Sequence, residues 1–125
     1  YVVLITAEGG IALLRPIFKT MTGIQNYLLF AFCAAWQIKC LKKYPMLLCL
    51  DAAHNNCYAP DDSRQNAFLH TIVAQHNEAG CGVPVAFMVT SSKTRVALEH
   101  WLGWMRDSIG LEGTLIFIID CSKTE

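Results

Sequence analysis

The sequence has no surplus of charge of either sign. Ten Lys and Arg residues balance ten Asp and Glu residues, and neither a basic nor an acidic tail is present. A domain that binds nucleic acid by itself normally carries a basic patch, so that electrostatic footprint is missing. Apolar residues make up 54% of the 125 positions and charged residues only 16%, which excludes intrinsic disorder. A chain with this much apolar surface is expected to have an interface or to lack a partner segment. We also expect that the sequence begins and ends inside a longer protein.

Long apolar runs and paired cysteine motifs are also absent. The longest apolar run, residues 28–36, has nine residues, whereas a membrane-spanning helix needs about 20. Residues 1–5 are apolar but lack the basic flank and cleavage site of a signal peptide. No CxxC spacing occurs among the six cysteines, which are Cys33, Cys40, Cys49, Cys57, Cys81 and Cys121. We therefore expect no membrane partner, and buried free thiols in a reducing compartment instead of disulfides.

Hydrophobic patterning predicts an alternation of helices and strands. The predicted helices span residues 30–44 and 94–109, and the predicted strands span 46–50, 68–75, 83–90 and 114–119. Residues 76–82 should form a hairpin with two glycines at positive φ, and residues 55–66 a polar loop. Residues 1–5 are β-rich, and residues 11–19 are strand-like or irregular because they contain Pro16.

These elements predict an α/β fold with a mixed sheet. The first three strands from residue 46 onward form an antiparallel meander, and the second helix crosses over to place the fourth strand parallel to the first. Residues 1–45 then form a flanking segment that ends in a helix, and residues 46–125 form the N-terminal part of the domain. Residues 122–125 have capping-box spacing, so a helix should begin there and the domain should be truncated at its C-terminal end.

The two predicted helices should each have one apolar and one polar face. The apolar stripe of the second helix consists of Leu98, Trp101, Leu102, Met105 and Ile109, followed by Gly110 at the position just after the helix. Trp104 falls outside this stripe and should be half-exposed or meet a missing part of the domain. The polar side of the first helix consists of Gln37, Lys39, Lys42 and Lys43. These lysines, with Arg95 and Arg106, either contact DNA phosphates or form ordinary solvated faces.

Two strands that should be buried each end in an aspartate. Asp51 follows residues 46–50, and Asp120 follows the fourth strand. If the strands are parallel neighbours, both carboxylates lie at one edge of the sheet, where their repulsion favours a divalent cation. Oxygen ligands suit Mg²⁺ or Mn²⁺, and such a site can assist phosphoryl transfer with two metals. An alternative without a metal stays open: Asp51 is then a turn residue, and Asp120 caps a helix.

An ordered set of motifs resembles the transposase domain of Mutator-like elements (MULE). The motifs are LDAAHN at residues 50–55, FLHTIV at 68–73, GVPVAFMV at 82–89, WLGW at 101–104 and IDCSKTE at 119–125, preceded by AWQ at 35–37 and KKY at 42–44. The resemblance covers roughly residues 30–125 and implies a ribonuclease H-like fold with an acidic DDE triad. That triad cuts and joins DNA with two divalent metals, Mg²⁺ or Mn²⁺. Asp51 and Asp120 match the first two catalytic, metal-binding carboxylates.

The resemblance also implies partners and a location. The full-length protein would bind transposon ends and target DNA, form homo-oligomers and act in the nucleus if its source is eukaryotic. His54 matches a common family position and either contacts substrate phosphate or orients Asp51, or it is a loop histidine bonded to a backbone carbonyl. A zinc site made of His54, Cys57, His76 and Cys81 matches no known ligand spacing. Asp61 and Asp62 should shape a turn.

The chain departs from the family pattern at several positions. Ala53 stands where the family often has threonine, and no counterpart of the third catalytic glutamate precedes the end of the sequence. Glu125 matches a position just after the second aspartate and suits a capping role. The downstream zinc-ligand segment and the terminal DNA-binding regions are absent as well. We therefore expect this part to be inactive alone, and its status as an enzyme stays open.

Two other functions remain open at this point. One is a domesticated, non-catalytic relative that serves as a DNA-associated regulator or an interaction module. The other is a different ribonuclease H-like nuclease, such as an exonuclease or a junction resolvase, which also uses paired aspartates. The GVPVAFMV and IDCSKTE motifs favour the transposase over the other nucleases, through resemblance only.

Overall fold

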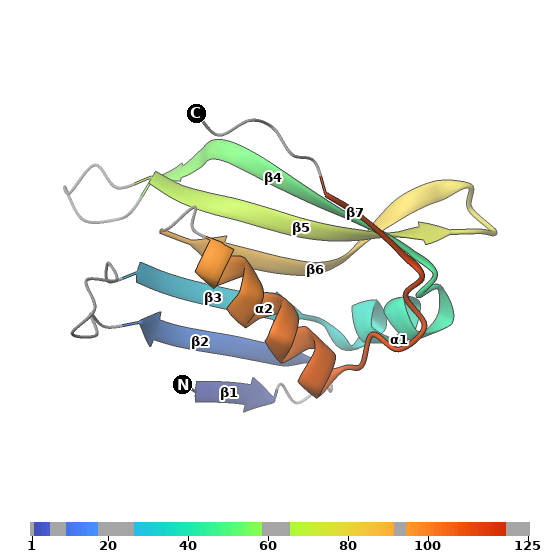
Figure 1. The fold of residues 1–125 in the computed structure, drawn as a ribbon, viewed down its shortest axis with the longest axis horizontal. Coiled ribbons are helices and arrows are strands. Elements are labelled where there is room, and N and C mark those ends of the chain that lie inside the picture. The colour runs from blue at the N-terminus through green and yellow to red at the C-terminus, as the bar shows by residue number, and fades with distance from the viewer. Residues whose placement is uncertain (1, 6–9, 18–26, 59–65, 92–94, 120–125) are drawn as a thin grey trace.

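The computed structural model describes residues 2–5, 10–17, 27–58, 66–91 and 95–119. The elements are β1 (Val2–Ile5), β2 (Ile11–Ile17), β3 (Tyr27–Cys33), α1 (Ala35–Lys43), β4 (Leu47–Tyr58), β5 (Asn66–His76), β6 (Cys81–Thr90), α2 (Arg95–Ser108) and β7 (Ile116–Ile119). The strands form one seven-stranded sheet in the order β1-β2-β3-β6-β5-β4-β7 (Figure 1). Neither helix of the described part of the chain has the length and apolar content needed to cross a membrane.

The second half of the sheet has the predicted topology. Strand β5 pairs antiparallel with both β4 and β6, and β7 pairs parallel with β4. Helix α2 provides the crossover connection between β6 and β7, as expected for a parallel strand that returns to the same sheet. The predicted meander, crossover helix and parallel fourth strand are therefore confirmed. The sheet also continues across the predicted boundary at residue 45, because β3 pairs antiparallel with β6.

The prediction that residues 30–44 form one helix is wrong for its first part. Strand β3 extends to Cys33, and α1 begins at Ala35. Strand β3 pairs with β2 on one side and with β6 on the other, so its backbone groups are satisfied by neighbouring strands. Its buried residues, Leu29, Ala31 and Cys33, alternate with a period of two, as in a strand. Residues 11–17 also form a strand, β2, despite Pro16.

The prediction of a polar loop at residues 55–66 is wrong at both ends of that range. Strand β4 continues to Tyr58 and β5 begins at Asn66, with a register shift between Ala53 and Cys57. Residues 59–65, including Asp61 and Asp62, lie outside the described residues. In the β5–β6 turn only one of the two glycines has positive φ: Gly80 has φ +64°, whereas Gly82 belongs to β6. Gly110, with φ +86°, follows α2 as predicted.

Helix α2 lies across one face of the sheet (Figure 1) and completes the core. Trp101 and Met105 are fully buried, and Leu98, Leu102 and Ile109 pack against the core as predicted. Trp104 is 9% exposed, so the expectation of a half-exposed side chain is wrong. Residues three apart on a helix lie on neighbouring positions of one face, which places Trp101 and Trp104 together. The sheet side of this core consists of Leu29, Ala31, Leu48, Leu50, Ile72, Ala74, Val85, Ala86 and Met88.

Helix α1 is anchored by a residue that was predicted to be solvated. Gln37 is 2% exposed, and its side chain donates a hydrogen bond to the backbone oxygen of Pro84 in β6 at 3.0 Å. The Gln37 Oε1 atom also accepts a hydrogen bond from the backbone N–H of Ala34 at 2.8 Å. The prediction of a polar face is therefore wrong for Gln37, whereas Lys39, Lys42 and Lys43 are exposed.

Candidate functional site

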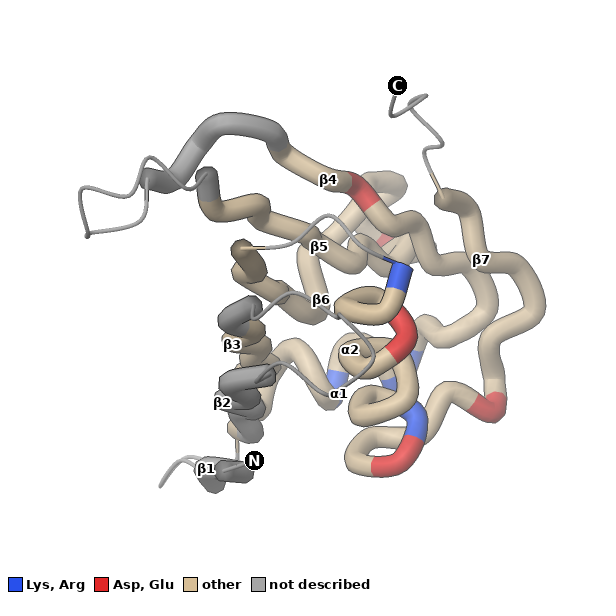
Figure 2. The backbone as a smooth tube through the Cα atoms, turned by 60° about the vertical axis from the view of Figure 1, so that its left-hand side comes forward, with Lys and Arg blue, Asp and Glu red and all other residues tan. Residues whose placement is uncertain are grey.

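Asp51 lies within β4 and on the side of the sheet opposite to α2. Leu48 and Leu50 belong to the core beneath α2, and successive side chains of a strand point to opposite faces. Asp51 is exposed, and both helices lie to the other side of the sheet (Figure 2). Because β4 continues to Tyr58, the prediction that Asp51 ends its strand is wrong. No described helix covers the face that carries Asp51, so its carboxylate is open to a ligand.

A row of side chains extends across four strands from Asp51. The register pairs Asp51 with Thr71, Thr71 with Phe87, and Phe87 with Phe32. The Phe32 and Phe87 rings stack with centroids 5.1 Å apart and an interplanar angle of 27°. A carboxylate, a hydroxyl and two aromatic rings therefore follow one another on this open face. Sequence reasoning missed Thr71, Phe87 and Phe32, although strand alternation combined with the register would have found them.

The second predicted carboxylate, Asp120, lies outside the described residues. The ladder on which its predicted position depends is present, because β7 pairs parallel with β4 from Leu47↔Ile116 to Leu50↔Ile119. Asp51 and Asp120 each directly follow the last pair of this ladder in the sequence. The pairing of the two carboxylates stays a prediction.

No set of side chains among the described residues forms a complete metal site. No group of three or more His, Cys, Asp or Glu side chains lies together among them. His54 and Cys57 lie on β4, so His54 is not a loop residue, and their side chains lie outside what the structure describes. His76 and Cys81 pair across the hairpin, and His76 Nδ1 accepts a hydrogen bond from the backbone N–H of Ala79 at 3.1 Å. Metal binding at Asp51 would therefore need further ligands.

Three of the basic residues considered for DNA contacts pair with carboxylates instead. Lys43 Nζ lies 3.0 Å from Glu78, and Arg106 Nε lies 2.9 Å from Asp107. Arg95 Nε lies 2.6 Å from Glu99. All three pairs are exposed, so each contributes little to stability. Their partial neutralisation favours the interpretation of these residues as ordinary solvated faces.

The described cysteines differ sharply in environment, and all four are free. Cys33 is buried, Cys40 and Cys49 are half-buried, and Cys81 is exposed, so the expectation of buried thiols fails for Cys81. The Cys33 thiol donates to the backbone oxygen of Val85 at 2.9 Å, and burial raises its pKa to about 12. The side chains of Cys57 and Cys121 lie outside the described residues.

Cys81 should react with iodoacetamide at least 100-fold faster than Cys33 in the folded chain. The reactive species is the thiolate, and burial both raises the pKa of Cys33 and blocks access to it. The pKa of the Cys33 thiol is higher in the folded chain than the ordinary value of 9.0, so the neutral thiol stabilises the folded state below about pH 9. This contribution to the free energy of unfolding falls as the pH rises from 9 towards 12. Peptide mass spectrometry after timed labelling measures both rates, and equal rates in the native chain would contradict the prediction.

Comparisons with known proteins give no identification of this chain. No family model, no curated protein and no solved structure matches it. The resemblance to the MULE transposase domain therefore stays a prediction that depends on the motifs and on the geometry around Asp51.

Proposed function

We propose that the chain forms the N-terminal part of a DDE-type transposase catalytic domain of the Mutator-like class. The observation that carries this proposal is the parallel β4–β7 ladder, which ends at Leu50↔Ile119 immediately before the two aspartates of the sequence. Two carboxylates that each follow the last pair of one parallel ladder would lie on adjacent strands at the same level of the sheet, where they could share a ligand. The reaction would be cleavage of a DNA phosphodiester followed by strand transfer.

The fold supports the ribonuclease H-like part of the proposal. An antiparallel meander of β4, β5 and β6, a crossover helix α2 and a parallel strand β7 beside β4 make the arrangement that the resemblance implies. The three additional strands β1, β2 and β3 extend the sheet beyond β6 and leave this arrangement intact. Fold alone does not define activity, so the proposal depends on the carboxylates.

Asp51 and Asp120 would hold Mg²⁺ or Mn²⁺ in this proposal. Asp51 fits the role in part, because it is an exposed carboxylate on a face that no described helix covers. A bound divalent cation would supply a Lewis acid that activates the attacking oxygen and stabilises the leaving oxygen. The chain itself contributes negative charge at Asp51 and an open sheet surface on which DNA can approach that carboxylate.

Calorimetric titration with Mn²⁺ tests this proposal directly. We expect saturable binding to the wild-type chain, at least tenfold weaker binding to Asp51→Asn, and none to Asp51→Asn/Asp120→Asn. Each asparagine removes a charge and keeps the shape of the side chain, and Asp51 is exposed, so the fold should persist. Asp107→Asn is the matched control, because Asp107 is also exposed and lies on α2 beside Arg106. Binding that survives in the double variant would contradict the proposal.

A non-catalytic interaction module is the second candidate function. It is favoured by the gathering of exposed apolar side chains along β7 and by the absence of a three-ligand group among the described residues. This candidate becomes the better supported of the two if the folded wild-type chain binds no Mn²⁺. A regulator of this kind would keep the sheet and use its surface instead of its carboxylates.

A further inference from the structure

Asp51 and Thr71 lie side by side on two neighbouring strands. Strand β4 pairs antiparallel with β5, and Asp51 and Thr71 are direct partners in this ladder. The side chains of direct partners point to the same face of the sheet, with their Cβ atoms about 4.5–5.5 Å apart. Asp51 is exposed and Thr71 is half-buried, so a ligand on the face opposite to α2 can reach both side chains.

The other side chains next to Asp51 on β4 and β5 are apolar or nearly so. Because a strand repeats every two residues, these neighbours are the residues two positions from Asp51 on β4 and two positions from Thr71 on β5. They are Cys49, Ala53, Leu69 and Val73. None of these side chains contains an oxygen or a nitrogen atom. Among these neighbours, only Thr71 can therefore form a strong hydrogen bond beside the Asp51 carboxylate.

The Thr71 hydroxyl has no role in holding the described fold together. Neither this hydroxyl nor the Asp51 carboxylate has a hydrogen-bond partner among the described residues. Valine has nearly the same shape as threonine and suits a strand equally well, so the strand itself does not require an oxygen at this position. Both polar groups are therefore available to a bound ligand.

We propose that Thr71 is a positioning residue of the Asp51 site, where its hydroxyl forms a hydrogen bond with a hydration water of the bound divalent cation. This inference rests on the proposed function, in which Asp51 holds Mg²⁺ or Mn²⁺. Such cations bind through few carboxylates and keep several of their waters. Polar groups beside the first ligands orient the site, and their removal weakens metal binding. A hydroxyl suits this role because it can both donate and accept a hydrogen bond.

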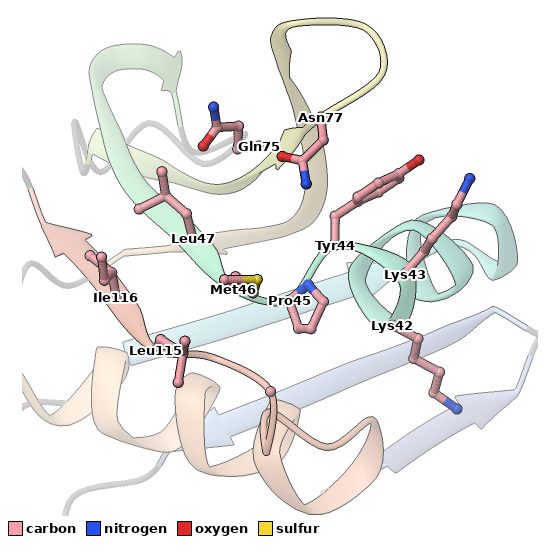
Figure 3. A pocket seen from close by; sticks show the side chains of 11 residues that line it. Lys42, Lys43, Tyr44, Pro45, Met46, Leu47, Gln75, Asn77, Leu115 and Ile116 are labelled. Atoms are coloured by element: carbon pink, nitrogen blue, oxygen red, sulfur yellow. The ribbon is translucent and has the colours of Figure 1, made fainter.

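Gln75 is the next polar side chain that β5 directs to this face, and it is too distant for the same role. It lies four residues from Thr71, which is about 13 Å along a strand. Gln75 lines a hollow of about 680 Å³ at the beginning of β4 and β7, together with Met46, Leu47 and Leu115 (Figure 3). The two polar positions therefore belong to separate regions of the sheet, and Gln75 provides a control on the same strand.

Calorimetric titration with Mn²⁺ tests this inference on the wild-type chain, Thr71→Val, Thr71→Ser and Gln75→Ala. We expect Thr71→Val to bind Mn²⁺ about three- to tenfold more weakly than the wild type, which is the effect of one lost hydrogen bond. Thr71→Ser keeps the hydroxyl and should restore most of the affinity. Gln75→Ala should bind Mn²⁺ as the wild type does. Far-UV circular dichroism verifies that each variant remains folded, as expected for a half-buried position and an exposed one.

The results that would overturn the inference differ in their bearing on the proposed function. Wild-type affinity in Thr71→Val, or binding by Thr71→Ser as weak as by Thr71→Val, would exclude a role for the hydroxyl while Asp51 remains a metal ligand. Equal losses in Thr71→Val and Gln75→Ala would attribute the effect to any change on β5 and would exclude a specific role as well. A folded wild-type chain that binds no Mn²⁺ would overturn both the inference and the proposed function.

Discussion

Replacing Trp101 with alanine should lower the free energy of unfolding by about 3–5 kcal/mol. The Trp101 side chain is fully buried between α2 and the sheet, where it shares the core with Leu48, Ile72 and Met105. Its indole Nε1 has no hydrogen-bond partner among the described residues, so the loss is one of packing and of buried apolar surface. A domain of this size is typically stable by only about 5–15 kcal/mol, so the variant should lose a large share of its stability.

Urea denaturation followed by circular dichroism measures this loss. Trp36→Ala serves as the control, because Trp36 is 56% exposed and its replacement should change the free energy of unfolding by less than about 0.5 kcal/mol. Trp101→Phe should lie between the two, since it keeps an aromatic ring in the core. A Trp101→Ala variant as stable as Trp36→Ala would mean that α2 does not pack on the sheet as described.

Gln37→Ala should lower the free energy of unfolding by about 1–3 kcal/mol, because two backbone groups would lose their side-chain partner. The Gln37 side chain joins the N-terminus of α1 to the Pro84 carbonyl of β6, with bonds of 2.8 Å to Ala34 and 3.0 Å to Pro84. The Gln37 side chain itself is only 2% exposed, so its replacement also removes buried packing at the start of α1. The effect should exceed that of a single side-chain hydrogen bond, because one side chain makes both bonds.

The control for Gln37 is the same substitution at an exposed glutamine. Gln75 in β5 is exposed, and Gln75→Ala should change the urea midpoint very little. Amide hydrogen exchange adds a local readout, because Gln37→Ala should raise the exchange rate of the Ala34 N–H. Similar urea midpoints for the two variants would show that Gln37 does not anchor α1.

The strands and the helix after residue 46 could be predicted because local pattern and tertiary environment agree there. Strands β5 and β6 are apolar segments separated by a glycine-containing turn, and α2 has a clear apolar stripe. Strand β3 was missed because an aromatic run such as YLLFAFC fits both a buried helix and a buried strand. Its pairing with β2 and β6 decides between them, and that pairing is non-local.

Only those features of the candidate site that depend on the pattern within a single strand could be predicted. Asp51 was found because a charge interrupts an apolar run, but the continuation of β4 to Tyr58 was not visible in that pattern. The neighbours of Asp51 on the open face, Thr71 and Phe87, depend on the register between strands. Register arises from pairing over long sequence distances, which periodicity within one strand does not encode.

The position of β7 beside β4 has a consequence for the order in which the chain folds. Strands β5 and β6 are joined by a short turn, whereas β4 and β7 are separated by two strands and a helix. Ladders between distant segments carry a high contact order and form late, because closing a long loop costs chain entropy. We therefore expect β7 to dock last and to be released first in local opening, so that Ile116 and Ile118 exchange their amide protons faster than the centre of β5. Any function that needs both aspartates would then exist only in the fraction of molecules in which this last strand is docked.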